Sequence, residues 1–200
     1  MRPAEVLLAS RYAAAELAGA LLLGKYARKT SDDYLRKQLT WHCYEEAGHA
    51  CLWTKVLQDK NLPLMEVHGK NEYFGYASQL ADDIEFLAWA HVYELRSVFH
   101  LKQHAKLGTL DATFKKAMLR IIGEEDKHLD WIAVYLKQRQ EEGNANIAAY
   151  VSKWGEVENA TYLKFVKETL TSADDAYLRD LGKLIEDNLS SYAFEWKRLL

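Results

Sequence analysis

The lengths of the breaks between helical segments constrain the fold of this chain more than any other feature. Apolar residues recur at three- and four-residue steps in six segments, and only two prolines and ten glycines interrupt the 200 residues. Long helices are therefore the expected elements, and the chain is predicted to be all-α. The expected helices cover about 5–29, 32–59, 79–107, 111–142, 146–170 and 174–199.

Two of the links between these helices are tight and one is long. The links at 30–33 and 108–111 reverse the chain within a few residues, so the helices that they join must be antiparallel. The link at 60–78, at about 3.3 Å per extended residue, is long enough to travel the length of a bundle. Two antiparallel hairpins and a long crossover predict a four-helix bundle over 1–143. The remaining 144–200 is predicted to be a C-terminal helical hairpin that covers a flank of the bundle or builds a homodimer interface.

Composition narrows the partners and the compartment. A net charge of −3 provides no basic surplus for nucleic acid or an anionic membrane. Cys43 and Cys51 lie eight residues apart in one expected helix, about 12 Å at 1.5 Å per residue, so no disulfide is expected between them and a reducing cytoplasm is the default. The apolar stretch 6–24 contains Arg11 and Glu16, which favours a buried helix over a signal sequence or a membrane span.

One chemical unit occurs twice in the expected bundle: a glutamate, a tight turn, then a glutamate and a histidine three residues apart. The second glutamate follows the first by 30 residues in one copy and by 31 in the other. Residues three apart share a helical face, and similar helix lengths before and after each turn return both glutamates to the same level. The members are Glu16, Glu46 and His49 in the first copy, and Glu94, Glu125 and His128 in the second.

Apolar neighbours indicate that these six side chains face inward. Leu23 accompanies Glu16, and Ile121 and Ile132 accompany Glu125 at helical spacing. Burying an uncompensated carboxylate costs several kcal/mol or more. Two divalent cations would offset four carboxylates, and neutral imidazoles would complete their coordination. The alternative is that the stripes are misphased and the acids lie in water.

These residues resemble the di-iron carboxylate site of the ferritin-like superfamily, which includes rubrerythrins, ferritins, aldehyde-deformylating oxygenases and bacterial multicomponent monooxygenases. The resemblance covers 5–142 and fills all six ligand positions. It implies a ferritin-like four-helix bundle in which Glu46 and Glu125 bridge two iron ions. Glu16 and Glu94 would be terminal ligands, and each histidine would bind one metal. Manganese, alone or mixed with iron, satisfies the same ligands.

The chain departs from rubrerythrins in two respects. It lacks the Cys-x-x-Cys pairs of a rubredoxin segment, and it carries His91 one turn before Glu94, whereas rubrerythrins bring an extra glutamate from this helix. His91 is either a satisfied core histidine or a member of the site, as a seventh ligand or a proton donor to bound oxygen. His42, one turn before Glu46, has the same alternatives.

Aromatic residues lie near several of the proposed ligands. Tyr12 precedes Glu16 by one turn and is a plain core tyrosine, a hydrogen-bond donor to the ligand carboxylate or a radical carrier. Trp41, Trp53 and two further tryptophans, Trp89 and Trp131, are expected to pack the bundle.

The resemblance implies a non-haem di-iron oxidoreductase that reduces or activates dioxygen or peroxide. Since the chain carries no electron-carrying motif, an external electron donor is expected. Two other interpretations stay open at this point. One is a ferroxidase that handles iron without an organic substrate, and the other is a non-enzymatic helical module that binds through its surface.

Overall fold

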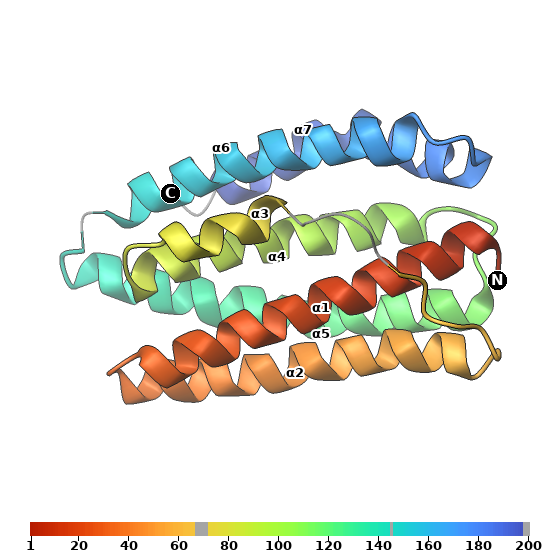
Figure 1. Ribbon diagram of the computed structural model, residues 1–200. Coiled ribbons are helices and arrows are strands. Elements are labelled where there is room, and N and C mark those ends of the chain that lie inside the picture. Colours follow the sequence, from red (N-terminus) through yellow and green to blue (C-terminus); the bar gives the residue numbers. More distant parts are fainter. Residues whose placement is uncertain (67–71, 145, 198–200) are drawn as a thin grey trace. The chain divides into compact units, whose positions relative to one another are not determined.

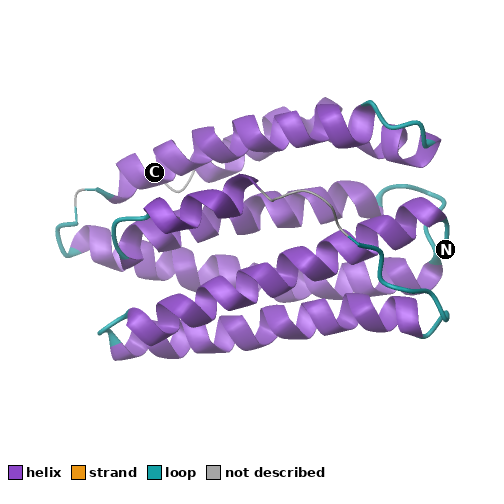
Figure 2. Ribbon diagram, in the orientation of Figure 1, coloured by secondary structure: helices purple, strands orange, loops and turns teal. Residues whose placement is uncertain are grey.

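The computed structural model describes residues 1–66, 72–144 and 146–197, and its long elements are all helices (Figure 2). Within these ranges there is no strand, so the prediction of an all-α chain is confirmed. The six long helices begin and end close to their predicted bounds. They are α1 (Pro3–Lys29), α2 (Asp33–Gln58), α4 (Asp83–Ala105), α5 (Ala112–Glu141), α6 (Ile147–Phe165) and α7 (Ala176–Lys197).

Three short elements were not predicted as separate pieces. A turn of α-helix, α3 (Glu72–Gly75), and a 3₁₀ turn, η1 (Tyr76–Gln79), lie in the long link, which has no helical pattern in the sequence. A π-helical turn, η2 (Val166–Thr171), directly follows α6. The part of the link at 67–71 lies outside the described residues.

Aspartate side chains cap the first turns of α2, α4 and α5. The Asp32 carboxylate accepts a hydrogen bond from the backbone N–H of Leu35 at 3.0 Å, which caps α2. Asp82 does the same for α4, accepting from the N–H of Glu85 at 2.8 Å. Asp111 accepts from two amides in the first turn of α5. Each cap satisfies amides that the helix itself leaves unpaired.

The chain divides into two compact units. The first comprises Met1–Ala77 and Thr109–Ile121, and the second comprises Ser78–Gly108 and Ile122–Leu200. The N-terminal part of α5 therefore belongs to the first unit and the rest of α5 to the second. The C-terminal hairpin of α6 and α7 falls in the same unit as α4.

In the first unit α1 and α2 lie side by side as an antiparallel hairpin (Figure 1). Leu8, Leu39 and Trp53 are almost completely buried in its core. The long link returns over α1, where the backbone N–H of Met65 donates to Ser10 Oγ at 3.0 Å. Burial of these large apolar side chains is the main stabilising term of the hairpin.

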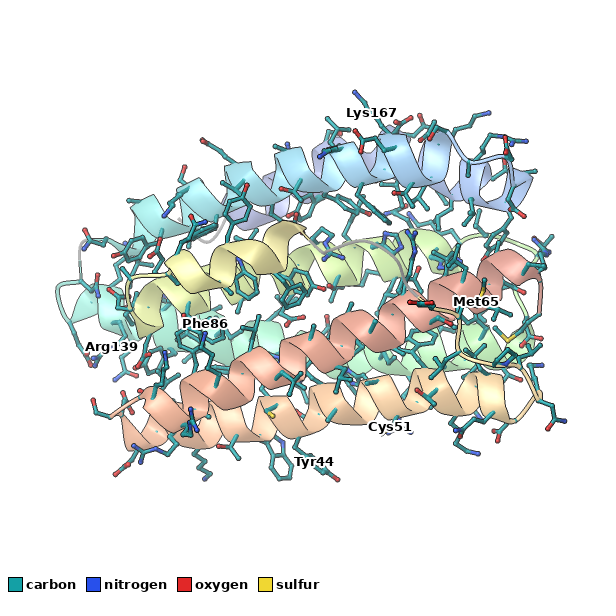
Figure 3. The ribbon with its side chains drawn as sticks, viewed as in Figure 1. Tyr44, Cys51, Met65, Phe86, Arg139 and Lys167 are labelled. Atoms are coloured by element: carbon teal, nitrogen blue, oxygen red, sulfur yellow. The ribbon has the colours of Figure 1, made fainter. Side chains whose placement is uncertain are left out.

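The outer side of the same hairpin exposes several large apolar side chains among polar ones. Leu21 on α1 is 69% exposed and Trp41 on α2 is 62% exposed, so the prediction that Trp41 packs inside is wrong. Figure 3 shows Tyr44 and Cys51 on this outward side of α2. Helical periodicity shows which apolar residues share a face of a helix, but it does not show whether another element covers that face. The prediction for Trp41 failed for this reason.

Helix α1 is, among the described helices, the one long and apolar enough to cross a membrane, a test that the core helix of a soluble protein also passes. Arg11 and Glu16 lie in the middle of this helix, and α1 packs along α2. Both features favour a core helix, one face of which is buried.

In the second unit α6 runs parallel to α4, and polar contacts between buried side chains set their register. Contacts that come later along α4 also come later along α6, which is the order that parallel helices require. The pairs are Glu85 with Trp154 at 3.1 Å, Arg96 with Glu158 at 2.6 Å and His100 with Tyr162 at 2.9 Å. Helix α7 also packs against α4, where the Phe99 and Tyr192 rings are 5.5 Å apart.

Candidate metal centre

The first unit brings three of the predicted ligands together. Glu16 comes from α1, and Glu46 and His49 come from α2, three residues apart on one helical face. Each offers one ligand atom, and these atoms all lie within 4.8 Å of one another. Glu46 and His49 are 3% and 2% exposed, and Glu16 is half-buried. Buried carboxylate and imidazole groups at this spacing could hold a metal ion.

The Glu46 carboxylate is the centre of this group. His49 Nδ1 lies 3.6 Å from Glu46 Oε1, and His42 Nε2 lies 3.5 Å from the same oxygen. Both distances exceed those of ordinary hydrogen bonds, so the atoms converge without being fully in contact. His42 is 1% exposed, and its position four residues before Glu46 puts both side chains on one face of α2.

Neighbouring side chains position the first-unit ligands. The indole N–H of Trp53 donates to Glu16 Oε1 at 3.4 Å, so a fully buried ring helps to orient this carboxylate. On α1, a Cβ added at Gly19 would lie 3.5 Å from Glu46 Oε2, which is ordinary van der Waals contact. The α1 backbone therefore passes close to the Glu46 carboxylate and leaves it little space on this side.

The second unit holds the other three predicted ligands. Glu125 and His128, three residues apart on α5, are 2% and 1% exposed, and His128 Nδ1 lies 2.7 Å from Glu125 Oε2. Two ligand atoms this close can bind one cation. Glu94 is 6% exposed on α4. Its burial agrees with the prediction that it faces inward, and its role as a ligand remains a prediction.

Burial of these groups indicates what they need chemically. Glu46 and Glu125 are carboxylates removed from water, and a histidine nitrogen lies within 4 Å of each of them. A buried carboxylate is costly unless a charge or several hydrogen bonds compensate it. A divalent cation supplies that charge, and neutral imidazoles are suitable further ligands. The residues present therefore fit a metal ion.

Tyr12 belongs to an aromatic cluster in the first unit. Its ring lies 5.1 Å from the Trp53 ring and stacks on Phe114 at 6.4 Å between centroids. This packing is what a plain core tyrosine requires. Its roles as a hydrogen-bond donor to Glu16 or as a radical carrier remain predictions.

His91 is buried on α4 but is not the satisfied core histidine that the sequence also allowed. It is 2% exposed, and within the described part of the chain neither ring nitrogen has a hydrogen-bond partner. Burial lowers the pKa of His91 to about 4, so the imidazole is neutral near pH 7.

A second buried polar cluster, on α4, α6 and α7, escaped the sequence analysis. Arg96 pairs with Glu158, and the His104 imidazole hydrogen-bonds the Tyr177 hydroxyl. These partners lie 62 and 73 residues apart in the chain, so no local spacing connects them. The only sequence feature that could have indicated this cluster is the presence of charged residues on otherwise apolar helical faces.

No family model, no curated protein and no solved structure matches the chain. The resemblance to the ferritin-like superfamily therefore rests on the repeated glutamate and histidine unit and on the order of the helices.

Proposed function

We propose that this chain is a ferritin-like di-metal carboxylate protein that uses iron to reduce or activate dioxygen or peroxide. The ligands in this proposal are the six residues of the repeated unit: Glu16, Glu46, His49, Glu94, Glu125 and His128. The observation that carries it is the convergence of Glu16, Glu46 and His49, whose ligand atoms lie within 4.8 Å of one another in a largely buried setting. The second copy of the unit repeats the buried glutamate and histidine pair in Glu125 and His128.

In this proposal the protein residues bind the metals and control their surroundings. When bound, two iron ions would supply the redox chemistry, with manganese as the other metal that these ligands suit. Four carboxylates would neutralise four positive charges, and the histidines would act as neutral ligands. Trp53 would hold Glu16 in place through its indole N–H. Electrons would come from an external donor in the cytoplasm.

The first experiment measures metal stoichiometry. Protein purified without oxygen and titrated with Fe(II) is expected to bind two ions per chain. Glu125→Ala should lose at least one of them, because Glu125 is proposed to bridge both. Glu124→Ala is the matched control and should keep both ions. Glu124 neighbours Glu125 in sequence, but its side chain points about 100° away around the helix axis. Two tightly bound ions in Glu125→Ala would refute the ligand assignment.

The second experiment separates catalysis from passive binding. Rapid mixing of the Fe(II)-loaded protein with dioxygen or peroxide should oxidise the iron faster than free Fe(II) in the same buffer. Oxidation that stops when the bound iron is consumed, and resumes only with added reductant, would agree with the need for an external donor. Continuous oxidation of added Fe(II) without any organic substrate would instead indicate iron handling. A rate equal to that of free Fe(II) would contradict both.

A further inference from the structure

The exposed aromatic side chains of the chain are concentrated on the first half of α2. They are Tyr34, Trp41 and Tyr44, and among the residues that the structure describes no other phenylalanine, tyrosine or tryptophan is as exposed. The Trp41 and Tyr44 rings lie 5.6 Å apart, and Figure 3 shows Tyr44 on the outward side of the helix. Tyrosine and tryptophan are the residues that the centres of protein interfaces favour.

Helix α1 adds two exposed leucines to the outer side of the hairpin. Leu17 and Leu21 lie one turn apart, and both are more than half exposed. A Cβ added at Gly24 would lie 3.4 Å from Cys43 Sγ, so α1 and α2 are in close contact beside Leu21 and Tyr44. A cluster of exposed apolar side chains marks an interaction site more often than single ones do. We call this cluster the hairpin patch: Leu17, Leu21, Trp41 and Tyr44.

A basic end adjoins the hairpin patch at the turn between α1 and α2. Between residues 17 and 44 the exposed charged side chains are five basic ones and a single acidic one, a surplus of four positive charges, whereas the whole chain has a net charge of −3. The acidic one, Asp33, pairs with Arg36. The basic ones are Lys25, Arg28, Lys29, Arg36 and Lys37. This local charge attracts an acidic partner, which the net charge of the chain does not reveal.

The metal ligands of the first unit lie on the opposite face of α2. Trp41 directly precedes the buried His42, and Tyr44 comes two residues before the buried Glu46. A helix with its side chains is about 10–12 Å across, so a molecule docked on the hairpin patch would be about one helix diameter from the Glu46 carboxylate. Electron transfer between proteins requires such short separations. An anionic bilayer would satisfy the same charge, but this position favours a partner that carries electrons.

We propose that the hairpin patch docks a small acidic protein that carries one electron on an iron–sulfur cluster or a flavin, and that this carrier reduces the metal centre. The inference rests on the proposed function, which needs an external electron donor. Each encounter would oxidise the carrier by one electron and reduce one ferric ion to ferrous, and no atom would be exchanged. Transient redox interfaces are small, below about 1,200 Å² in total, and four apolar side chains with a basic rim suit that size.

Docking is measured first on the full-length metal-free protein. It is titrated calorimetrically with two acidic carriers, a plant-type ferredoxin and a flavodoxin, at low and at high salt, and with cytochrome c as a basic carrier. One patch variant is Trp41→Gln, and the other combines Lys25→Glu with Arg28→Glu. The matched controls replace exposed side chains of the same kind on other helices: Val134→Gln, and Lys167→Glu combined with Lys183→Glu.

Binding of the acidic carriers should weaken by about tenfold or more in both patch variants and at high salt, and it should be unchanged in the controls. Cytochrome c should not bind. Because the replaced side chains are exposed, the urea midpoints should equal that of the parent protein. In iron-loaded, oxidised protein, anaerobic reduction by the pre-reduced carriers should slow by a similar factor in the patch variants. Reduction by dithionite, which needs no docking, should be unchanged.

The results that would overturn the proposal are distinguishable. Equal binding and equal reduction in the patch variants and the parent protein would refute docking at the hairpin patch and leave the proposed function standing. A patch that binds phosphatidylglycerol vesicles, or a second copy of the chain in sedimentation, in place of the carriers would identify a different occupant. A parent protein that binds no Fe(II) would refute the proposed function and the delivery of electrons together.

Discussion

The ion pair of Arg96 and Glu158 permits a quantitative prediction about how α6 is held on α4. Arg96 Nε lies 2.6 Å from Glu158 Oε1, and the two side chains are 17% and 2% exposed. The Arg96 guanidinium also lies 4.3 Å from the Tyr93 ring centre and 5.4 Å from that of Tyr162. Burial alone would lower the pKa of Arg96, but the neighbouring tyrosines and Glu158 hold it above its ordinary value, so the arginine stays charged.

Glu158→Ala would leave this charge without its carboxylate. Removing one partner of a buried ion pair lowers the free energy of unfolding by about 3–5 kcal/mol. Because Arg96 is still partly hydrated, we expect a loss near the lower end of this range, about 3 kcal/mol. A domain of ordinary stability has only about 5–15 kcal/mol in total. The double replacement Arg96→Met with Glu158→Leu removes both charges. Its free energy of unfolding should be higher than that of the parent protein or lower by no more than about 1 kcal/mol.

Urea unfolding of the metal-free protein at neutral pH, followed by circular dichroism, measures both changes. Glu156→Ala is the control, because this side chain is exposed on the same helix and its loss should stay within about 0.5 kcal/mol. A loss below about 1 kcal/mol in Glu158→Ala would refute the reasoning, since it would mean that water already solvates Arg96. A large loss that persists in the double variant would indicate a packing role instead of an electrostatic one.

Three further predictions concern stability and assembly. Burial lowers the pKa of His104 to about 3, so the folded state binds fewer protons than the unfolded state between about pH 3 and 6.5, and stability should fall as pH drops below 6.5. In urea titrations His104→Leu should reduce that slope by about 1.4 kcal/mol per pH unit. Gly182→Ala should lower the free energy of unfolding by about 1–3 kcal/mol, because the added Cβ would lie 2.8 Å from the Thr171 backbone nitrogen. Gly48→Ala should raise it by about 0.5–1 kcal/mol in the same assay, because a Cβ at Gly48 meets open space. A chain ending near Gly143 should still load two metals but aggregate more readily in light scattering, because apolar surface on α4 loses its cover.

Local features of the fold could be predicted because nearby residues determine them. Asp32 and Asp111 begin α2 and α5 through hydrogen bonds to amides two or three residues away, which the sequence displays directly. Gly143 ends α5 with a φ of +99°, a conformation that favours glycine. The spacing of Glu46 and His49 likewise follows from helical geometry alone.

Features that depend on distant partners could not be predicted. Whether Trp41 is buried depends on what covers its side of α2, and the described structure leaves it 62% exposed. The pairing of Glu158 with Arg96 spans 62 residues and has no local spacing. His91 looks the same in sequence as a satisfied core histidine, and only the three-dimensional surroundings distinguish the two.

The most direct test of the central claim is anomalous X-ray scattering at the iron edge from crystals of protein loaded with Fe(II) without oxygen. The account predicts two iron peaks per chain, ligated by Glu16, Glu46 and His49 of the first repeat and by Glu94, Glu125 and His128 of the second. No iron peak, a single ion, or ions held by other side chains would contradict it.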